Sequence, residues 1–159
     1  MKGSGPAVTV IFVCHGNICR SPLAEMYARH VARQEGLTAV EFASAGLIEP
    51  GNPMSTGSAG ALRRLGIEPG PHESRTISLS MLARASLVLA MEEGQKRAIL
   101  RDFDGLAGKV FSLGEFAGHA GVDVDDPYGG SAEDYDRMAA QVKGLIDEAW
   151  PRLRKLAGR

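Results

Sequence analysis

The chain has 159 residues, 44% of them hydrophobic and 23% charged, which is enough to bury the core of one ordinary globular domain. Its formal net charge of −1 gives no electrostatic reason to bind nucleic acid or an acidic membrane surface. The apolar run at residues 8–13 is too short for a signal peptide, and no stretch approaches the ~20 apolar residues that cross a bilayer.

The two cysteines of the chain, Cys14 and Cys19, are too close in sequence to staple a fold. A secreted domain of this size would not depend on such a pair, so we expect a cytoplasmic protein whose thiols are kept reduced. Residues 1–7 contain two glycines and a proline. They are expected to form a flexible N-terminus ahead of a single domain at residues 8–159.

Strands and helices are expected to alternate along the chain. Residues 8–13 form a β-branched apolar run, typical of a strand buried on both faces. Helical spacing follows at residues 22–36, with a proline at the first helical position and a glycine at the end. In the last helix Ser131 is the expected N-cap, and Pro151 is expected to kink that helix or end it early. The other expected elements are a strand at 40–44, helices at 58–65 and 80–84, a strand at 87–91, a helix at 93–101, a strand at 110–113, a loop at 114–130 and the last helix at 131–156.

This alternation predicts an α/β fold in which one parallel sheet is covered by helices on both faces. Four strands and the helices between them make a single-domain three-layer sandwich. Ligands of such sheets bind beyond the carboxyl ends of the strands. The loop that follows the first strand lies at that edge, so we expect it to hold the functional site.

Residues 14–21 have the composition of an anion-binding loop. Cys14 ends the buried strand, Arg20 stands six positions later, and a helix begins directly afterwards. Backbone N–H groups of such a loop curl into a nest for an oxyanion, and the helix N-terminus adds further donors and a positive dipole end. The planar guanidinium of Arg20 binds two phosphate oxygens at once, and Gly16 leaves the backbone free to turn.

The same loop predicts a nucleophilic cysteine. A thiol at a helix N-terminus beside an arginine is stabilised as thiolate, and Ser21 is placed to donate a hydrogen bond to it. A thiolate inside a phosphate cradle is arranged to attack phosphorus and form a phosphocysteine. No Gly-Lys-Ser/Thr follows, so the loop is not a Walker A motif. The cysteines and histidines nearby lack the spacing of a zinc site.

Transfer of a phosphoryl group to cysteine also needs a proton donor for the leaving group. Asp126 in the run Asp126-Pro127-Tyr128 is the best candidate, since the proline stiffens the loop and the tyrosine is able to flank a pocket. Asp126 would be protonated in the first step and act as base toward water in the second. Asp125 is its immediate rival and Asp123 a weaker one.

Taken together, Cys14-x5-Arg20-Ser21-Pro22 near the start and Asp126-Pro127-Tyr128 near the end resemble the low-molecular-weight protein-tyrosine phosphatases. The resemblance runs from residue 8 to the last helix, and the run GNICRSP is its most specific part. It implies a four-stranded parallel sheet, no metal or other cofactor, and a phosphocysteine intermediate formed on Cys14, with Arg20 binding phosphate and Asp126 as general acid. The implied phosphate-binding loop is His15, Gly16, Asn17, Ile18, Cys19 and Arg20, and the implied supporting network is Asn17, Ser21, Ser44 and His72.

Cys19 matches the second loop cysteine of that family. The resemblance implies that it forms a reversible disulfide with Cys14 and protects the nucleophile from further oxidation. A buried small residue without a redox role is the alternative for this position.

The residues expected to line the pocket bear on the substrate. Ile18, Leu47 and Tyr128 are the expected pocket walls, and residues 47–50 lack the aromatic residue that many members of the family carry there. The Gly-Gly-Ser run after Tyr128 also resembles the bacterial protein-arginine phosphatases, in which a threonine stands at the position of Ile18. An apolar, branched residue there favours a flat aromatic ring, so we predict phosphotyrosine in proteins as the substrate, with phosphoarginine as the alternative.

Two other functions are weaker alternatives for this pattern. A thioredoxin-coupled arsenate reductase would bind an oxyanion in the same cradle, but it needs further cysteines downstream, and none follows Cys19. A module that only binds phosphopeptides would need the nucleophile or the acid to be missing, and both are present. The expected partners are therefore a phosphorylated protein substrate and the phosphate released from it.

Overall fold

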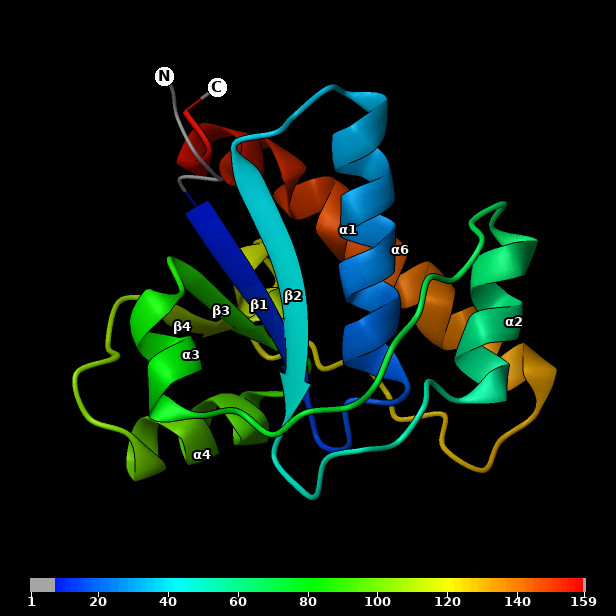
Figure 1. The fold of residues 1–159 in the computed structure, drawn as a ribbon, viewed down its shortest axis with the longest axis horizontal. Coiled ribbons are helices and arrows are strands. Elements are labelled where there is room, and N and C mark those ends of the chain that lie inside the picture. The colour runs from blue at the N-terminus through cyan, green and yellow to red at the C-terminus, as the bar shows by residue number, and fades with distance from the viewer. Residues whose placement is uncertain (1–7, 159) are drawn as a thin grey trace.

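The structure is a computed structural model that describes residues 8–158, and the expectation of a flexible N-terminus at residues 1–7 lies outside them (Figure 1). Strands alternate with helices along most of the chain, as predicted. The elements in chain order are β1 (Val8–Cys14), α1 (Arg20–Gln34), β2 (Val40–Gly46), α2 (Thr56–Arg64), α3 (Leu79–Arg84), β3 (Leu87–Ala90), α4 (Glu93–Asp102), β4 (Val110–Ser112), α5 (Leu113–Phe116) and α6 (Ala132–Leu156).

The four strands form one parallel sheet in the order β2-β1-β3-β4. β1 is central, and Cys14 at its end pairs with Gly46 at the end of β2. Successive side chains of a strand point to opposite faces, so β1 contributes to two separate cores. Val10 and Phe12 belong to the larger core, whereas Ile11 and Val13 belong to the smaller one.

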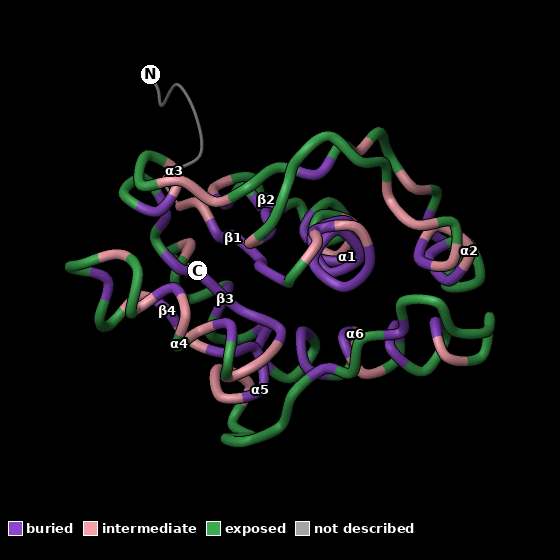
Figure 2. Tube along the Cα trace, turned by 90° about the horizontal axis from the view of Figure 1, so that it is seen from below, coloured by how far each residue is buried: buried purple, intermediate pink, exposed green. Residues whose placement is uncertain are grey.

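Helices cover both faces of this sheet, which confirms the predicted three-layer α/β architecture. The larger core packs the sheet against α1 and α6, with Leu23 and Ile146 fully buried, and α2 lies beside α6 (Figure 1). The smaller core lies under α3 and α4, where Leu82 and Ile99 are buried. Buried residues follow β1 and β3 between these layers in Figure 2.

Two element boundaries differ from prediction near the site. α1 begins at Arg20, two residues before Pro22, because the loop closes directly into the first helical turn. β2 continues to Gly46 rather than ending at residue 44. The earlier start of α1 shortens the phosphate loop, and the longer β2 extends the sheet to the position beside Cys14.

Capping side chains account for two further differences, at α2 and α5. α2 begins at Thr56 because Ser55 caps it by accepting a hydrogen bond from the backbone N–H of Ser58. The predicted loop at 114–130 is preceded and partly occupied by α5, which Ser112 and Glu115 close with a capping box. Ser131 caps α6 as predicted, with Asp134 completing the box. Pro151 lies inside α6 without ending it, since the helix continues to Leu156.

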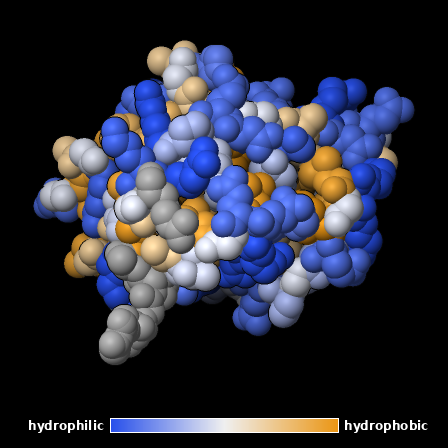
Figure 3. All heavy atoms as spheres, turned by 90° about the horizontal axis from the view of Figure 1, so that it is seen from above, coloured by the Kyte–Doolittle hydropathy of each residue, from blue (hydrophilic) through white to orange (hydrophobic). Residues whose placement is uncertain are grey.

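The carboxyl ends of all four strands meet at the lower edge of the molecule in Figure 1. The opposite end carries mainly hydrophilic side chains, with apolar ones in small separate areas (Figure 3). Between residues 8 and 158, no helix is both long and apolar enough to cross a membrane. The loop after β1 begins at the carboxyl edge of the sheet.

Candidate active site

The loop between β1 and α1 holds the Cys14 sulfur among hydrogen-bond donors. Cys14 is buried, and the backbone N–H groups of Asn17 and Ser21 point at its Sγ from 3.3 and 3.4 Å. The Ser21 hydroxyl lies 3.0 Å from the same sulfur. Two backbone N–H groups and one hydroxyl therefore converge on the Cys14 sulfur.

The tight course of this loop requires Gly46 and a left-handed residue. A Cβ at Gly46 would lie 2.9 Å from the Cβ of Asn17 and 3.0 Å from the carbonyl oxygen of His15, closer than real contacts allow. Asn17 has a φ of 57°, a conformation that is uncommon for residues other than glycine. The end of β2, Ser44-Ala45-Gly46, thus lies directly against the phosphate loop.

Hydrogen bonds from three segments hold Asn17 in this conformation. Its side-chain oxygen accepts from the backbone N–H of Arg75 at 3.0 Å, and its amide nitrogen donates to Ser21 and Ser44 at 2.8 and 2.9 Å. His72 contacts the carbonyl oxygen of Asn17 through Nε2 at 2.7 Å. All members of the predicted supporting network therefore meet at Asn17, and strain in the loop is balanced by full hydrogen bonding.

This network also fixes the direction of the Ser21 proton. Because a backbone N–H faces the Asn17 oxygen, the amide nitrogen must face Ser21 and donate to its Oγ. The Ser21 proton is then free for Cys14 Sγ at 3.0 Å, and its other neighbour, the carbonyl oxygen of Ala45, is more distant at 3.5 Å. Ser21 consequently donates to the sulfur, which stabilises a thiolate.

Glu25 and Arg75 are parts of this network that sequence reasoning missed. Glu25 is buried, accepts the Ser44 hydroxyl at 2.6 Å and is paired with Arg29. Arg75 also donates through Nε to the carbonyl oxygen of Ser44 at 3.1 Å. The helical spacing from Ser21 to Glu25 places both on one side of α1, which is the signal that could have indicated Glu25.

Arg20 is fully buried at the start of α1 and is held by acceptors on two sides. Its Nη1 donates to a carboxylate oxygen of Glu92 and, at 2.8 Å, to the carbonyl oxygen of Val124. Its Nη2 lies 3.6 Å from Asp126. Its Nε is buried and has no hydrogen-bond partner within residues 8–158. A buried donor without a partner is costly, and an oxyanion in the loop would accept a hydrogen bond from it.

Of the three candidate acids, only Asp126 lines the same cavity as Cys14. Asp126 is half-exposed, and its Oδ1 accepts from the backbone N–H of Tyr128 at 3.1 Å. The Asp123 carboxylate instead accepts from the backbone N–H of Glu93 at 2.9 Å. Asp125 lines a neighbouring hollow, which Asp126 also borders, and does not line the Cys14 cavity. The geometry therefore favours Asp126 over both rivals.

The cavity above Cys14 has a volume of about 870 Å³. Ile18 and Tyr128 line it as predicted, and Tyr128 is exposed at its mouth. Leu47 was predicted as a third wall and is not one, since it packs against the smaller core on the other side of the sheet. The neighbouring Ile48, 45% exposed, lines the cavity instead. The other lining residues are His15, Gly16, Cys19, Arg20, Asn52, Pro53, Met54, Ser55, Thr56, Gly129 and Tyr135.

Comparison with known proteins assigns this arrangement to a family. The family described as "Low molecular weight phosphotyrosine protein phosphatase" matches residues 9–156. The chain belongs to the low molecular weight phosphotyrosine protein phosphatases. The resemblance seen in the sequence is thereby confirmed, and the chain is a phosphatase of this family.

Relatives of this phosphatase carry two different substrate names. The protein-arginine-phosphatase of Bacillus subtilis (strain 168) is 36% identical over 147 residues, which cover 92% of this chain and 97% of the relative. The probable low molecular weight protein-tyrosine-phosphatase EpsP of Ralstonia solanacearum is 33% identical over 149 residues, covering 93% and 97%. A solved structure of a YwlE arginine phosphatase mutant with a phosphorylated active-site serine matches with a TM-score of 0.88 and 34% identity, covering 93% of this chain and 97% of that one.

The second loop cysteine of this phosphatase, Cys19, contacts two hydroxyl groups in the structure. The Cys19 thiol donates to Ser55 at 3.4 Å and lies 3.7 Å from the Tyr135 hydroxyl. Both cysteines are free thiols. Burial raises the pKa of Cys19, so its thiol is protonated at neutral pH. A disulfide with Cys14 stays a prediction.

We expect iodoacetate at neutral pH to modify one cysteine of this phosphatase, Cys14. Cys19 should be labelled only as the pH rises toward its raised pKa, because the thiolate is the reactive form. Intact-mass analysis followed by peptide mapping measures this, and Cys14→Ser is the control that should take up no label. Comparable labelling of both cysteines at neutral pH would contradict the assignment.

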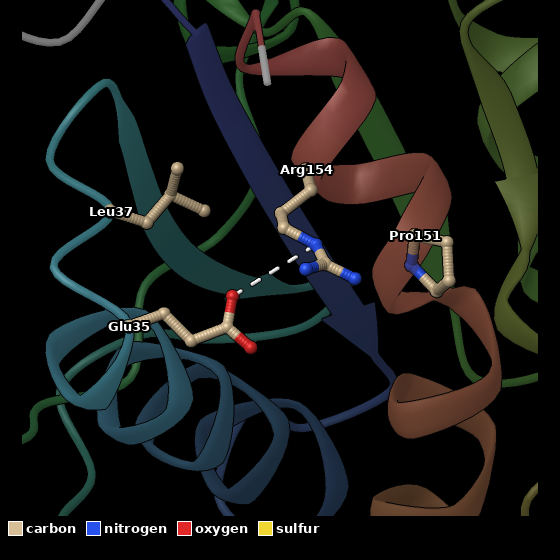
Figure 4. Close-up of a pocket in the computed structure, with 4 residues that line it drawn as sticks. All are labelled: Glu35, Leu37, Pro151 and Arg154. Carbon is tan, nitrogen blue, oxygen red and sulfur yellow. Dashed lines mark ion pairs between the residues drawn. The ribbon is translucent and has the colours of Figure 1, made fainter.

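A second hollow lacks the chemistry of the Cys14 cavity. It has a volume of about 550 Å³ and lies between the end of α1 and the end of α6, lined by Glu35, Leu37, Pro151 and Arg154 (Figure 4). Glu35 and Arg154 pair there at 3.9 Å, and no nucleophile is present among the lining residues. Within residues 8–158, no group of three or more His, Cys, Asp and Glu side chains is arranged to hold a metal ion.

Proposed function

We propose that this phosphatase hydrolyses phosphotyrosine in proteins through a phosphocysteine intermediate. The observation that carries the substrate assignment is the apolar wall that Ile18 forms in the Cys14 cavity. The reaction takes place in two displacements at phosphorus, and the same few side chains serve both.

In the first displacement the Cys14 thiolate attacks phosphorus as the bond from phosphorus to the tyrosine oxygen breaks. The loop N–H groups and the Nε and Nη2 groups of Arg20 bind the equatorial oxygens, whose charge changes in the transition state. Asp126 gives its proton to the departing phenolate oxygen. The products are a neutral tyrosine hydroxyl, an ionised Asp126 and a phosphoryl group on sulfur.

In the second displacement water attacks the phosphocysteine. The Asp126 carboxylate takes a proton from this water, and the bond from phosphorus to sulfur breaks. The leaving thiolate is stabilised by the Ser21 hydroxyl, which donates toward Sγ from 3.0 Å. Inorganic phosphate is released and Asp126 is protonated again. The related YwlE mutant carries a phosphorylated active-site serine, which supports a covalent phospho-enzyme intermediate in the present phosphatase.

The pocket walls support an aromatic substrate group. Ile18, Ile48 and Met54 offer aliphatic surface, and Tyr128 offers an aromatic face on which a phenyl ring packs. A phosphoarginine side chain would bring several N–H donors to the same place. Ile18 provides no acceptor for them, and each buried unpaired donor costs free energy.

We expect Ile18→Thr to change the preference of the enzyme between the two substrates. The ratio of kcat/KM for phosphotyrosine peptide to kcat/KM for phosphoarginine peptide should fall by about 10-fold, because the wall loses apolar contact with the ring and gains a hydroxyl for the guanidinium. Steady-state kinetics with two peptides of otherwise identical sequence measures this ratio.

Ile48→Thr is the matched control, since it makes the same replacement on the outer, half-exposed part of the wall. It should change the ratio by less than Ile18→Thr does. A parent enzyme that prefers the phosphoarginine peptide would overturn the phosphotyrosine assignment in favour of the alternative, protein-arginine phosphatase activity, while leaving the two displacements unchanged.

A further inference from the structure

The segment that leads into Asp126 is fastened at Asp123, the rejected candidate for the acid. The Asp123 carboxylate accepts from the backbone N–H of Glu93 at 2.9 Å, at the first turn of α4. Its backbone carbonyl accepts from the side-chain amide of Gln141 at 2.9 Å. Asp123 is thus held by α4 on one side and by α6 on the other.

Gln141, in the middle of α6, contacts the segment from Asp123 to Asp125. Besides donating to the carbonyl of Asp123, its side-chain oxygen faces the backbone N–H of Asp125 at 3.4 Å. The amide therefore spans the two residues on either side of Val124. Val124 itself is buried and is bound through its N–H to Met91 and through its carbonyl to Arg20.

The same helix end that holds Asp123 also orients Arg20. Glu92 is the N-cap of α4, and its carboxylate binds Nη1 of Arg20. The next residue, Glu93, donates its backbone N–H to the Asp123 carboxylate. The phosphate-binding arginine and the acid segment are consequently positioned from adjacent residues. Gln141 reaches the same segment from α6, through the backbone of Asp123 and Asp125.

We propose that Gln141 is a positioning residue for the general-acid step, acting through the backbone of Asp123 and Asp125 to set the place of Asp126 relative to Cys14. This assignment rests on the proposed role of Asp126. Gln141 itself does not line the Cys14 cavity, so it acts through the segment and not on the substrate.

Leaving groups of different basicity separate a positioning role from a merely structural one. Phenolate is a strong base that needs a proton as it departs, whereas p-nitrophenolate delocalises its charge and depends less on the acid. kcat/KM reports the steps up to departure of the leaving group, so a misplaced acid lowers it more for phenyl phosphate than for p-nitrophenyl phosphate. A general loss of folded enzyme lowers both equally.

The experiment measures kcat/KM on both substrates for the parent, Gln141→Leu, Gln141→Glu and Asp126→Asn. Gln141→Leu keeps the size of the side chain and removes both contacts, and Gln141→Glu keeps only an acceptor. Gln34→Leu is the matched control, because Gln34 is exposed on α1. Thermal unfolding of each variant checks that the chain is folded.

We expect Gln141→Leu and Gln141→Glu to lower kcat/KM for phenyl phosphate by about 10-fold and to change that for p-nitrophenyl phosphate by less than about 3-fold, with Gln34→Leu like the parent. Asp126→Asn should show the same selectivity with a larger loss. Equal losses on both substrates, or none, in the Gln141 variants while Asp126→Asn remains selective would overturn the positioning role alone. An Asp126→Asn variant without selectivity would overturn the acid assignment itself, and the positioning role with it.

Discussion

Replacing Cys14 by serine is expected to lower kcat by roughly 10³-fold or more, because a serine hydroxyl is a far weaker nucleophile at neutral pH than a stabilised thiolate. The replacement changes one atom in a buried site whose sulfur is contacted by Asn17 and Ser21. The loop N–H groups and Arg20 remain in place. We therefore expect the variant to bind inorganic phosphate about as tightly as the parent while it fails to turn over p-nitrophenyl phosphate.

Steady-state kinetics measures the loss of turnover, and calorimetric titration with phosphate measures the retained binding. Cys19→Ser is the matched control, since it exchanges the same atom five residues later in the same loop, and it should retain turnover within about 3-fold of the parent because Cys19 is not the attacking group. Full turnover by Cys14→Ser would end the phosphocysteine mechanism. Loss of phosphate binding together with turnover would show instead that the loop had collapsed.

The phosphate loop could be predicted from sequence because its parts are contiguous. Cys14, Arg20 and Ser21 lie within eight residues between a strand and a helix, so local geometry alone brings them together. Ser44 and His72 required the family resemblance, and the structure places both against Asn17. Asp126 could be chosen from the Asp126-Pro127-Tyr128 run, but its rivals Asp125 and Asp123 stayed open and the resemblance added the support for it.

Residues whose role depends on long-range contacts could not be predicted. Glu92 and Glu93 follow β3 at the correct edge, but the sequence does not say which of the two faces Arg20. Gln141 acts on a segment that precedes its own helix, through backbone groups that carry no sequence signal. Such contacts depend on how α4, α6 and the segment before Asp126 pack together, and composition and periodicity do not predict that packing.

The exchange of Leu47 for Ile48 as pocket wall has a local cause. Side chains alternate between the faces of a strand, so the end of a strand decides which residue faces the cavity. β2 runs two residues further than predicted, to Gly46, and Leu47 then packs on the far face. The missed α5 is also local, because a single helical turn of four residues is too short to show periodicity, although its Ser112–Glu115 capping box was readable.

Replacing Arg20 by lysine is expected to lower kcat/KM by roughly 10²-fold or more although the positive charge is retained. The guanidinium divides its donors between two tasks: Nη1 holds Glu92 and Val124, whereas Nε has no partner and, with Nη2, would serve the oxyanion of the proposed mechanism. A lysine ammonium is a single point that cannot reach the acceptors on one side and two phosphate oxygens on the other. The variant would either leave the Glu92 carboxylate without its partner or bind phosphate through one contact.

Steady-state kinetics on p-nitrophenyl phosphate tests this, with Arg33→Lys as the matched control, because Arg33 is exposed in the last turn of the same helix and should tolerate the exchange. Glu92→Gln supplies the complementary variant, since an amide oxygen still accepts from Nη1 and the fork of Arg20 stays oriented. We expect a loss of about 10-fold or less there, smaller than in Arg20→Lys. An Arg20→Lys enzyme with parental kcat/KM would mean that phosphate is bound by charge alone, and the buried, unpartnered Nε would then have no part in catalysis.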